Sequence, residues 1–348
     1  MTATHTGVWR TTMKNTTIIL LTLLLAAAPL AAQSKVGTSA APFLGMPIGA
    51  RGIGMGGAFV ALATDVSALY YNPGAISQPG YSQFLVSHTD WLVDTKFDWV
   101  GVMVNLDGSS AIGVSITQLD YGEELITTET DQDGTGEMWT AADIAVALTY
   151  ARNLTDRFSI GGTAKYIQQK IWNESASSFA LDVGLKYKTD FNGLTIGMSI
   201  ANFGADMRLD GKDLFRPIDL DPDNTGTNKT IVSRLKTDDW PLPLFFRAGV
   251  AMDVLSYGDM RLTAAVDALR PSDSNETVNL GGEFAWRETI FLRGGMNSLG
   301  LSDRESSASF GAGAKYELTG ANLISFDYSY QDWGKFGGIQ SFAIGITF

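Results

Sequence analysis

Apolar and polar residues alternate with a period of two along most of the chain after about residue 82. Between residues 179 and 184, for example, Phe, Leu and Val alternate with Ala, Asp and Gly, and 246–253, 261–268 and 324–331 repeat the pattern. A period of two predicts strands with one apolar and one polar face. A soluble β-sandwich would show the same alternation, so the pattern alone does not choose between a sandwich and a barrel.

The length and spacing of the alternating segments favour a barrel. Most segments have about 9–11 residues, the length that crosses a bilayer when a strand is tilted. When the segments are numbered in chain order, the gap after each even-numbered segment is short and the gap after each odd-numbered segment is longer. The gaps at about 119–141 and 204–242 are much longer. We expect about fourteen strands, at 82–88, 97–105, 110–118, 142–151, 157–170, 177–188, 194–203, 243–254, 259–268, 276–286, 289–297, 307–317, 321–331 and 338–348.

This parity of gaps is typical of an outer-membrane barrel whose short turns and both termini face the periplasm, and a sandwich has no reason to keep it. We therefore predict an all-β fold in which residues 82–348 form a transmembrane antiparallel β-barrel of about fourteen strands, surrounded by outer-membrane lipid. The last strand ends in Phe348 and resembles the carboxy-terminal signal by which such barrels are recognised for assembly. Mixed charges are expected to point into the lumen: Lys165, Asp182, Arg247, Asp253, Arg261, Asp267, Glu283, Arg287 and Asp327.

Residues 1–32 are predicted to be an export signal. Lys14 supplies a positive n-region, residues 18–28 an apolar h-region, and Leu30-Ala31-Ala32 a small-residue cleavage site. The alternative is a membrane-spanning helix, but the uninterrupted apolar stretch is shorter than the ~20 residues that a span needs, and Pro29 breaks its end. No second apolar run of that length follows, which leaves a soluble periplasmic protein or an outer-membrane barrel.

Composition excludes several kinds of chemistry. The 348 residues include no Cys and two His, and the formal net charge is −12. The absence of Cys excludes disulfides, thiolate nucleophiles and cysteine metal sites. The acidic balance argues against nucleic acid as a partner, because phosphate binding needs a basic face. Since no nucleophile, base and oxyanion hole come together in the sequence, we expect no enzyme and no cofactor.

Two acidic stretches have the spacing of calcium loops, Asp131-x-Asp133-Gly134 and Asp219-x-Asp221-x-Asp223. Oxygen ligands two residues apart can converge on one cation where the loop turns at a glycine. In the second stretch Asn224 stands where that glycine would be, and Thr230 replaces the bidentate Glu. Because the ligand set is incomplete, we interpret both stretches as solvated acidic loops and expect no metal.

Residues 33–81 do not alternate, and glycine is frequent among them. We expect this segment to plug the lumen, because glycine allows backbones to approach closely in a crowded interior. Residues 58–68 are predicted to form a short helix, and 72–74 a turn leading into the first strand. The run Gly52-x-Gly54-x-Gly56-Gly57 invites a nucleotide-binding interpretation, but no βαβ unit surrounds it.

The same segment resembles the opening of the PorV/PorQ family. The resemblance rests on residues 49–61, then Asp65, Ser67, Ala68 and Tyr71-Asn72-Pro73, although the family usually has Ala where this chain has Gly74. The family belongs with the FadL-like fatty-acid transporter barrels of fourteen strands, whose amino-terminal segment plugs the lumen. The resemblance therefore implies a plug motif made of Gly49, Arg51, Gly54, Gly56, Gly57, Asn72 and Pro73.

Two functions are implied by this resemblance. PorV-type members serve the type IX secretion system, where they receive cargo carboxy-terminal domains and dock on the translocon. FadL-like members instead transport hydrophobic small molecules passively across the outer membrane. Inward positions of this chain favour small and charged residues over an apolar lining, which favours protein export. A purely structural barrel stays open as a third possibility.

The outer loop at 204–242 is expected to carry partner recognition. It is the longest irregular stretch, and loops of that length are uncommon unless they are functional or disordered. It holds many apolar residues, and exposed apolar patches often mark contacts. The candidates for the contact are Phe215, Ile218 and Trp240. Alternatively, these residues fold the loop back over the barrel mouth as a lid.

Overall fold

The computed structural model describes residues 36–219, 223, 231–301, 308–318 and 322–348. The export signal predicted over residues 1–32 lies outside the described residues, and so do Asp221, Asn224 and Thr230 of the second acidic stretch. Among the residues that are described, no helix combines the length and the apolar character needed to cross a membrane.

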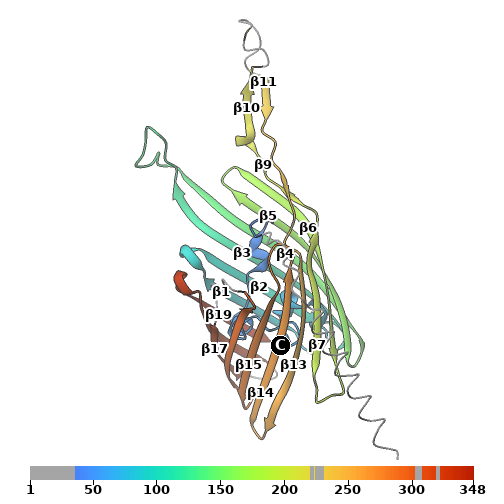
Figure 1. Cartoon of the computed structure of the whole chain (residues 1–348). Coiled ribbons are helices and arrows are strands. Elements are labelled where there is room, and N and C mark those ends of the chain that lie inside the picture. The colour runs from blue at the N-terminus through green and yellow to red at the C-terminus, as the bar shows by residue number, and fades with distance from the viewer. Residues whose placement is uncertain (1–35, 220–222, 224–230, 302–307, 319–321) are drawn as a thin grey trace, which may run out of the picture. The chain divides into compact units, whose positions relative to one another are not determined.

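Fourteen long strands close into an antiparallel barrel in the described part of the chain (Figure 1). Each strand pairs with its neighbours along the chain, and the last strand pairs with the first, so that Gln83 lies opposite Thr347. The prediction of a fourteen-stranded barrel is confirmed. The strands are β1 (Gln83–Asp90), β2 (Lys96–Asn105), β3 (Ser110–Leu125), β4 (Met138–Thr155), β5 (Phe158–Ile171), β6 (Glu174–Lys188), β7 (Thr195–Gly204), β13 (Phe245–Tyr257), β14 (Met260–Pro271), β15 (Thr277–Trp286), β16 (Ile290–Leu299), β17 (Ala308–Glu317), β18 (Leu323–Asp332) and β19 (Gly338–Thr347).

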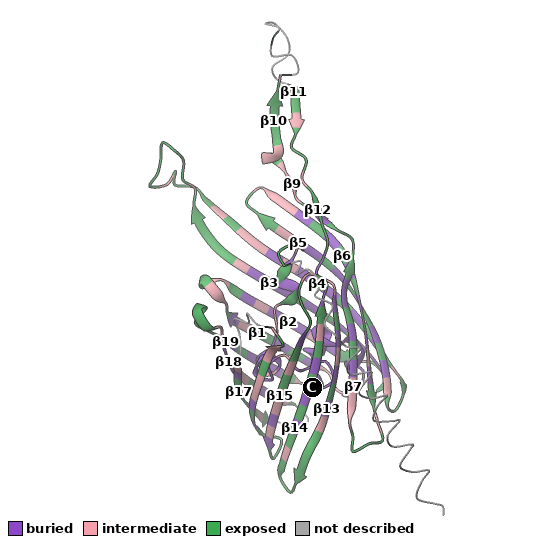
Figure 2. Ribbon diagram, in the orientation of Figure 1, coloured by how far each residue is buried: buried purple, intermediate pink, exposed green. Residues whose placement is uncertain are grey.

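Burial alternates along the barrel strands, as the colours of Figure 2 show. In β4, Ala145, Ala147 and Thr149 are buried, whereas Val146 and Leu148 are exposed. Apolar side chains thus cover the outward face, which a bilayer would contact, and small or polar side chains face the lumen. The alternation in the sequence therefore predicted the correct face for these residues.

The two long connections differ from the prediction. β3 and β4 continue to pair beyond a bulge after Asp120 as far as Leu125 and Met138, so the first long loop spans 126–137. The second connection is not irregular, because its backbone groups find partners in short strands. It holds β8 (Met207–Arg208), β9 (Asp210–Gly211), η4 (Lys212–Leu214), β10 (Phe215–Ile218), β11 (Ile231–Arg234) and β12 (Asp239–Trp240).

Four of these short strands pair among themselves at the barrel's long-loop end, and the fifth joins the barrel sheet. β10 and β11 form a hairpin, β8 pairs with β12, and β9 adds to the edge of β6. In Figure 1 the hairpin lies at the top of the view, beyond β9. The prediction of an irregular loop over 204–242 is wrong in this respect.

The segment before β1 is folded into short helical turns: η1 (Pro42–Gly45), α2 (Ala50–Gly54), α3 (Ala68–Tyr71) and η2 (Pro73–Ala75), while η3 (Leu92–Asp94) and η5 (Gly334–Phe336) lie in barrel loops. The helix predicted over 58–68 is wrong, since α3 begins only at Ala68. The backbone N–H groups of Phe59 and Val60 donate instead to the Asp267 carboxylate of β14, at 2.6 and 2.8 Å.

The first described residues and the carboxy terminus lie at opposite ends of the barrel. Ser82 and Phe348 exchange two backbone hydrogen bonds, of 3.1 and 2.9 Å, at the end that carries the short turns. At the other end, Ala40 N donates to Pro241 O at 2.9 Å, and the Ser39 hydroxyl bonds to Asp273. The carboxy terminus lies at the predicted short-turn end, together with the start of β1, whereas the amino terminus lies outside the described residues.

The outward face predicts a depth-dependent cost for a charge. Leu148 and Leu154 both point outward from β4, but Leu148 lies mid-strand and Leu154 lies at the short-turn end. Leu148→Arg is expected to lower the free energy of unfolding by about 2–4 kcal/mol, and Leu154→Arg by about 0–1 kcal/mol. Denaturant titration of the barrel in lipid vesicles measures both values. Equal losses at the two positions would contradict a membrane-spanning β4.

Candidate functional site

Residues 41–77 contact inward faces on several sides of the barrel. Their backbone carbonyls accept hydrogen bonds from Lys186 of β6 (2.7 Å), Ser199 of β7 (2.9 Å) and Ser309 of β17 (3.4 Å). Because these strands belong to different sides of a closed barrel, the segment lies within the lumen. Its buried backbone groups are satisfied by the wall, as buried polar groups generally must be.

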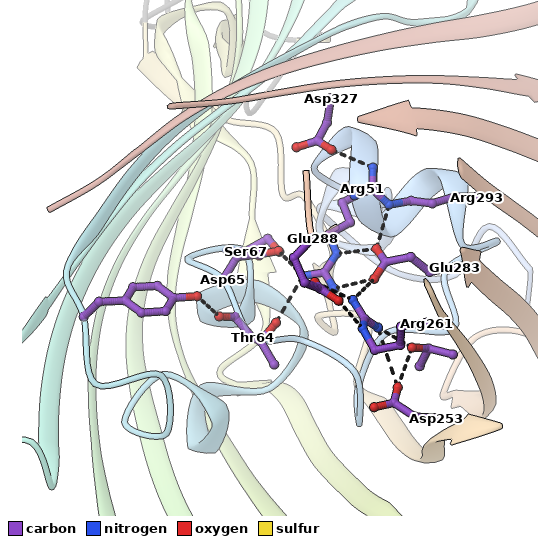
Figure 3. Close-up of polar contacts among 12 residues, drawn as sticks. Arg51, Thr64, Asp65, Ser67, Asp253, Arg261, Glu283, Glu288, Arg293 and Asp327 are labelled. Carbon is purple, nitrogen blue, oxygen red and sulfur yellow. Dashed lines mark hydrogen bonds and ion pairs between the residues drawn. The ribbon is translucent and has the colours of Figure 1, made fainter. Parts of the chain in front are cut away.

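Arg51 of α2 links this segment to the wall (Figure 3). Its guanidinium donates to the Glu283 carboxylate of β15, Nε to Oε2 at 3.0 Å and Nη2 to Oε1 at 3.2 Å. Nη1 donates to Asp65 Oδ2 at 2.9 Å and to the Thr64 hydroxyl at 3.1 Å. A two-pronged bond of this kind fixes both the position and the orientation of α2.

Glu283 is the centre of a wider ion-pair network in the wall. Its side chain is fully buried and also meets Arg293 of β16 at 2.8 Å and Arg261 of β14 at 3.3 Å. Arg293 continues to Asp327 of β18 at 2.6 Å, and Arg261 to Glu288 at 2.7 Å. A buried carboxylate is costly unless it is paired, and here three guanidinium groups surround it.

The electrostatics of the segment keep both of its charged groups ionised. Burial by itself would lower the pKa of Arg51, but the carboxylates of Glu283 and Asp65 outweigh this and hold the pKa above its ordinary value. Burial likewise opposes ionisation of Asp65, yet Arg51 and the hydrogen bonds from Ser67 hold its pKa below the usual range. Opposite charge at hydrogen-bond distance thus outweighs desolvation at both groups.

Gly56 meets the wall backbone to backbone. Its φ is 66°, which an L-residue with a side chain rarely adopts, and a Cβ there would lie 2.6 Å from the Met296 nitrogen of β16. Only glycine fits both conditions. The other glycines of the predicted motif lie in the same part of the segment: Gly49 precedes α2, Gly54 ends it opposite Gly311 of β17, and Gly57 faces Asn279 of β15.

Asn72 and Pro73 fasten the far end of the segment to β6. The fully buried Asn72 amide donates to the backbone oxygens of Val60 and Leu185, both at 2.9 Å, and its side-chain oxygen accepts from Gly74 N at 3.1 Å. Pro73 begins η2, which packs against β5 and β6. Arg51 and Asn72 therefore attach the segment at separate places on the wall.

Two arginines were not placed correctly from the sequence. Arg293 was not among the predicted inward charges, although it alternates in β16 with the outward Leu292 and could have been found by that pattern. Arg287 was predicted to point inward but lies in the β15–β16 turn, where its exposed side chain pairs with Asp259 at 2.9 Å. The predicted strand ended correctly at residue 286, so the second error was to assign an inward direction to a residue of the following turn.

A largely apolar pocket of about 560 Å³ opens at the long-loop end. Its lining comes from the long-loop ends of β3, β4 and β5 and from β8 and β12. Part of this lining is polar, because Asp143 accepts hydrogen bonds from Tyr121 Oη and Gln169 Nε2, both at 3.0 Å. The larger apolar contributions to its lining come from Trp139, Ile171, Met207, Leu209 and Trp240.

The three residues predicted to contact a partner do not form one site. Trp240 lines the pocket, whereas Phe215 and Ile218 belong to the β10–β11 hairpin. All three side chains are exposed, with 46, 48 and 41% of their surface accessible in that order. Within the described residues there is no group of three or more His, Asp or Glu that could hold a metal ion.

Comparison with known proteins places the chain among outer-membrane barrels. A family model described as type IX secretion system protein PorV matches residues 30–225. No curated protein matches the chain. Among solved structures, the CymD monoaromatic hydrocarbon channel has a TM-score of 0.54 at 11% identity, over 86% of this chain and 96% of the channel.

Two further structures are similar. The toluene transporter TodX of P. putida gives a TM-score of 0.53 at 13% identity, over 86% of this chain and 96% of TodX. A Pseudomonas aeruginosa FadL homologue gives 0.51 at 14% identity, over 87% of this chain and 98% of the homologue. At such identities these structures show a shared fold and nothing more.

The Arg51 network predicts a large difference between two arginines. Arg51→Met leaves Asp65 and Glu283 short of a buried partner and is expected to lower the free energy of unfolding by about 3 kcal/mol or more. Arg287→Met removes an exposed pair and is expected to cost less than about 1 kcal/mol. Thermal or denaturant unfolding of the purified barrel measures both variants. A loss from Arg51→Met as small as that from Arg287→Met would show that the network does not anchor the segment.

Proposed function

The chain belongs to the PorV family of type IX secretion system proteins, and we propose on that basis that it is a non-enzymatic component of protein export. The family and the fold make it an outer-membrane β-barrel. In the proposed function it receives cargo carboxy-terminal domains, or docks on the translocon, through its outer loops. The export signal over residues 1–32 is part of the same proposal.

The observation that carries this proposal is the packing of residues 41–77 in the lumen. We propose that residues 33–81 form a plug, which leaves the loops as the accessible part of the protein. A second cavity, of about 110 Å³, lies beside Arg51, Asp65 and Lys315 and shares no lining residue with the pocket at the long-loop end. Because the two cavities are separate, they support the interpretation of the barrel as a scaffold rather than as an open conduit.

The β10–β11 hairpin is the proposed contact for a cargo domain. Apolar side chains occupy both of its faces, since Phe215 and Val232 lie on one and Ile218 and Ile231 on the other. These side chains are exposed, Val232 to 69%. A two-stranded ribbon that buries so little apolar surface gains little stability by itself, and exposed patches of this kind often mark interaction sites.

Replacing Phe215 and Ile218 by Ser is expected to weaken binding of a purified type IX cargo carboxy-terminal domain by about tenfold or more, because two apolar contacts are lost. A binding titration with the detergent-solubilised full-length barrel measures this. Phe191→Ser, which removes an aromatic residue of 68% exposure from a short turn at the opposite end, serves as the control. Unchanged affinity in the double variant would refute recognition through this hairpin.

The outer pocket supports a second candidate function, passive transport of a hydrophobic small molecule. The similar CymD and TodX structures are a monoaromatic hydrocarbon channel and a toluene transporter. The pocket's volume of about 560 Å³ lies within the range typical of small-molecule sites, and its apolar walls with a few polar groups are typical as well. The polar lining of the rest of the lumen makes this the weaker candidate.

Trp240 allows this second candidate to be tested by fluorescence. If the pocket binds toluene, the ligand should change the tryptophan emission of the wild-type barrel, and Trp240→Ala should weaken the apparent affinity by about tenfold. Trp286→Ala, at the short-turn end of β15, is the matched control and should leave affinity unchanged. Identical titration curves for all three proteins would contradict a ligand site at Trp240.

A further inference from the structure

The two outer edges of the β10–β11 hairpin differ in their free backbone donors. The strands pair in the register Phe215–Arg234, Pro217–Val232, and Leu235 N donates to Leu214 O at 2.9 Å. In an antiparallel ladder, hydrogen-bonded and non-hydrogen-bonded pairs alternate. The bond at Leu235 therefore makes Phe215–Arg234 and Pro217–Val232 non-hydrogen-bonded pairs, whose backbone groups point away from the partner strand.

The edge of β10 has no free donor. The N–H of Phe215 already donates to Lys212 O, where it closes η4. Pro217 has no N–H at all, and proline on an outer edge is a recognised way to prevent further strand pairing. This edge is therefore closed.

The edge of β11 has no such protection. Among the described residues β11 pairs with β10 alone, so the outward N–H and C=O groups of Val232 and Arg234 meet no other strand. No proline interrupts the four residues Ile231–Arg234. The Arg234 guanidinium pairs with Asp210 of β9, and β9 in turn pairs with β6, which ties the base of the hairpin to the barrel.

We propose that the open edge of β11 binds an extended segment of the exported cargo by adding it as a third strand. This inference rests on the proposed export function. Main-chain hydrogen bonds at Val232 and Arg234 supply the affinity, and alternate side chains of the added strand pack beside the exposed Val232 on one face and Ile231 on the other. The complementary chemistry is a β-branched or aromatic segment without proline, in an extended conformation.

Two substitutions at one position separate backbone from side-chain recognition. Val232→Pro removes an outward donor and leaves the hairpin's own bonds, whereas Val232→Thr keeps the donor and a β-branched side chain. The full-length barrel in detergent is titrated with a purified type IX cargo carboxy-terminal domain. Val232→Pro should weaken binding by about tenfold or more and Val232→Thr by less than about twofold. Pro217→Thr, on the closed edge, should not weaken binding.

Arg234→Pro provides a second test in case Val232→Pro disturbs the hairpin. It removes the other outward donor, and Arg234→Met is its control because both variants lose the pair with Asp210. Equal trypsin cleavage at Arg216 in Val232→Pro and in the wild-type protein would show that the hairpin is retained. Weaker binding of each Pro variant than of its control supports the added strand.

The remaining outcomes overturn the proposal in distinguishable ways. If wild type binds the domain and both Pro variants bind as well as their controls, the edge is not used, although the export function stands. If Val232→Thr loses as much affinity as Val232→Pro, recognition is by the side chain and the added strand is refuted. If the wild-type barrel does not bind the domain, the export function and this inference fail together.

Discussion

The buried carboxylate of Glu283 is the constraint on which the arrangement of the lumen depends. A carboxylate with no solvent contact must be paired, and the wall strands supply Arg261 and Arg293 for this purpose. The amino-terminal segment supplies the third cation, Arg51. The same ion pairs that make the charge tolerable thus fix the segment to β15, and indirectly to β14, β16 and β18.

Away from the Glu283 network, close contact between the amino-terminal segment and the barrel wall depends on glycines in both of them. Gly56 of the segment meets β16 through backbone atoms, and Asn72 reaches the backbone of β6 beside Gly184. Small residues allow the hydrogen-bonding groups of segment and wall to come within bonding distance, so the desolvated backbone keeps its partners. Charge pairing and backbone approach therefore act together to hold the segment against the wall.

The sequence predicted the barrel well because strand faces are decided locally, by the alternation of residues such as Leu148 and Thr149. The lumen charges Glu283 and Asp327 were found in the same way. Interactions across the barrel could not be found, since Phe59 and Val60 bond to Asp267, more than two hundred residues away. The position of the Phe59 and Val60 backbone therefore could not be predicted from local residues. The hairpin was missed because each of its strands is too short to show a period.

The path of the segment through the lumen has a consequence for how the chain assembles. Gln83 pairs with Thr347, so the seam between β1 and β19 joins the start of the barrel to its last strand, and it cannot form until the whole barrel sequence is present. Contacts so distant in sequence are slow to form. Residues 41–77 run from one mouth of the cylinder to the other, and threading them through a finished ring would drag buried charges along its axis. An order in which the wall wraps around the segment before the seam closes avoids this threading.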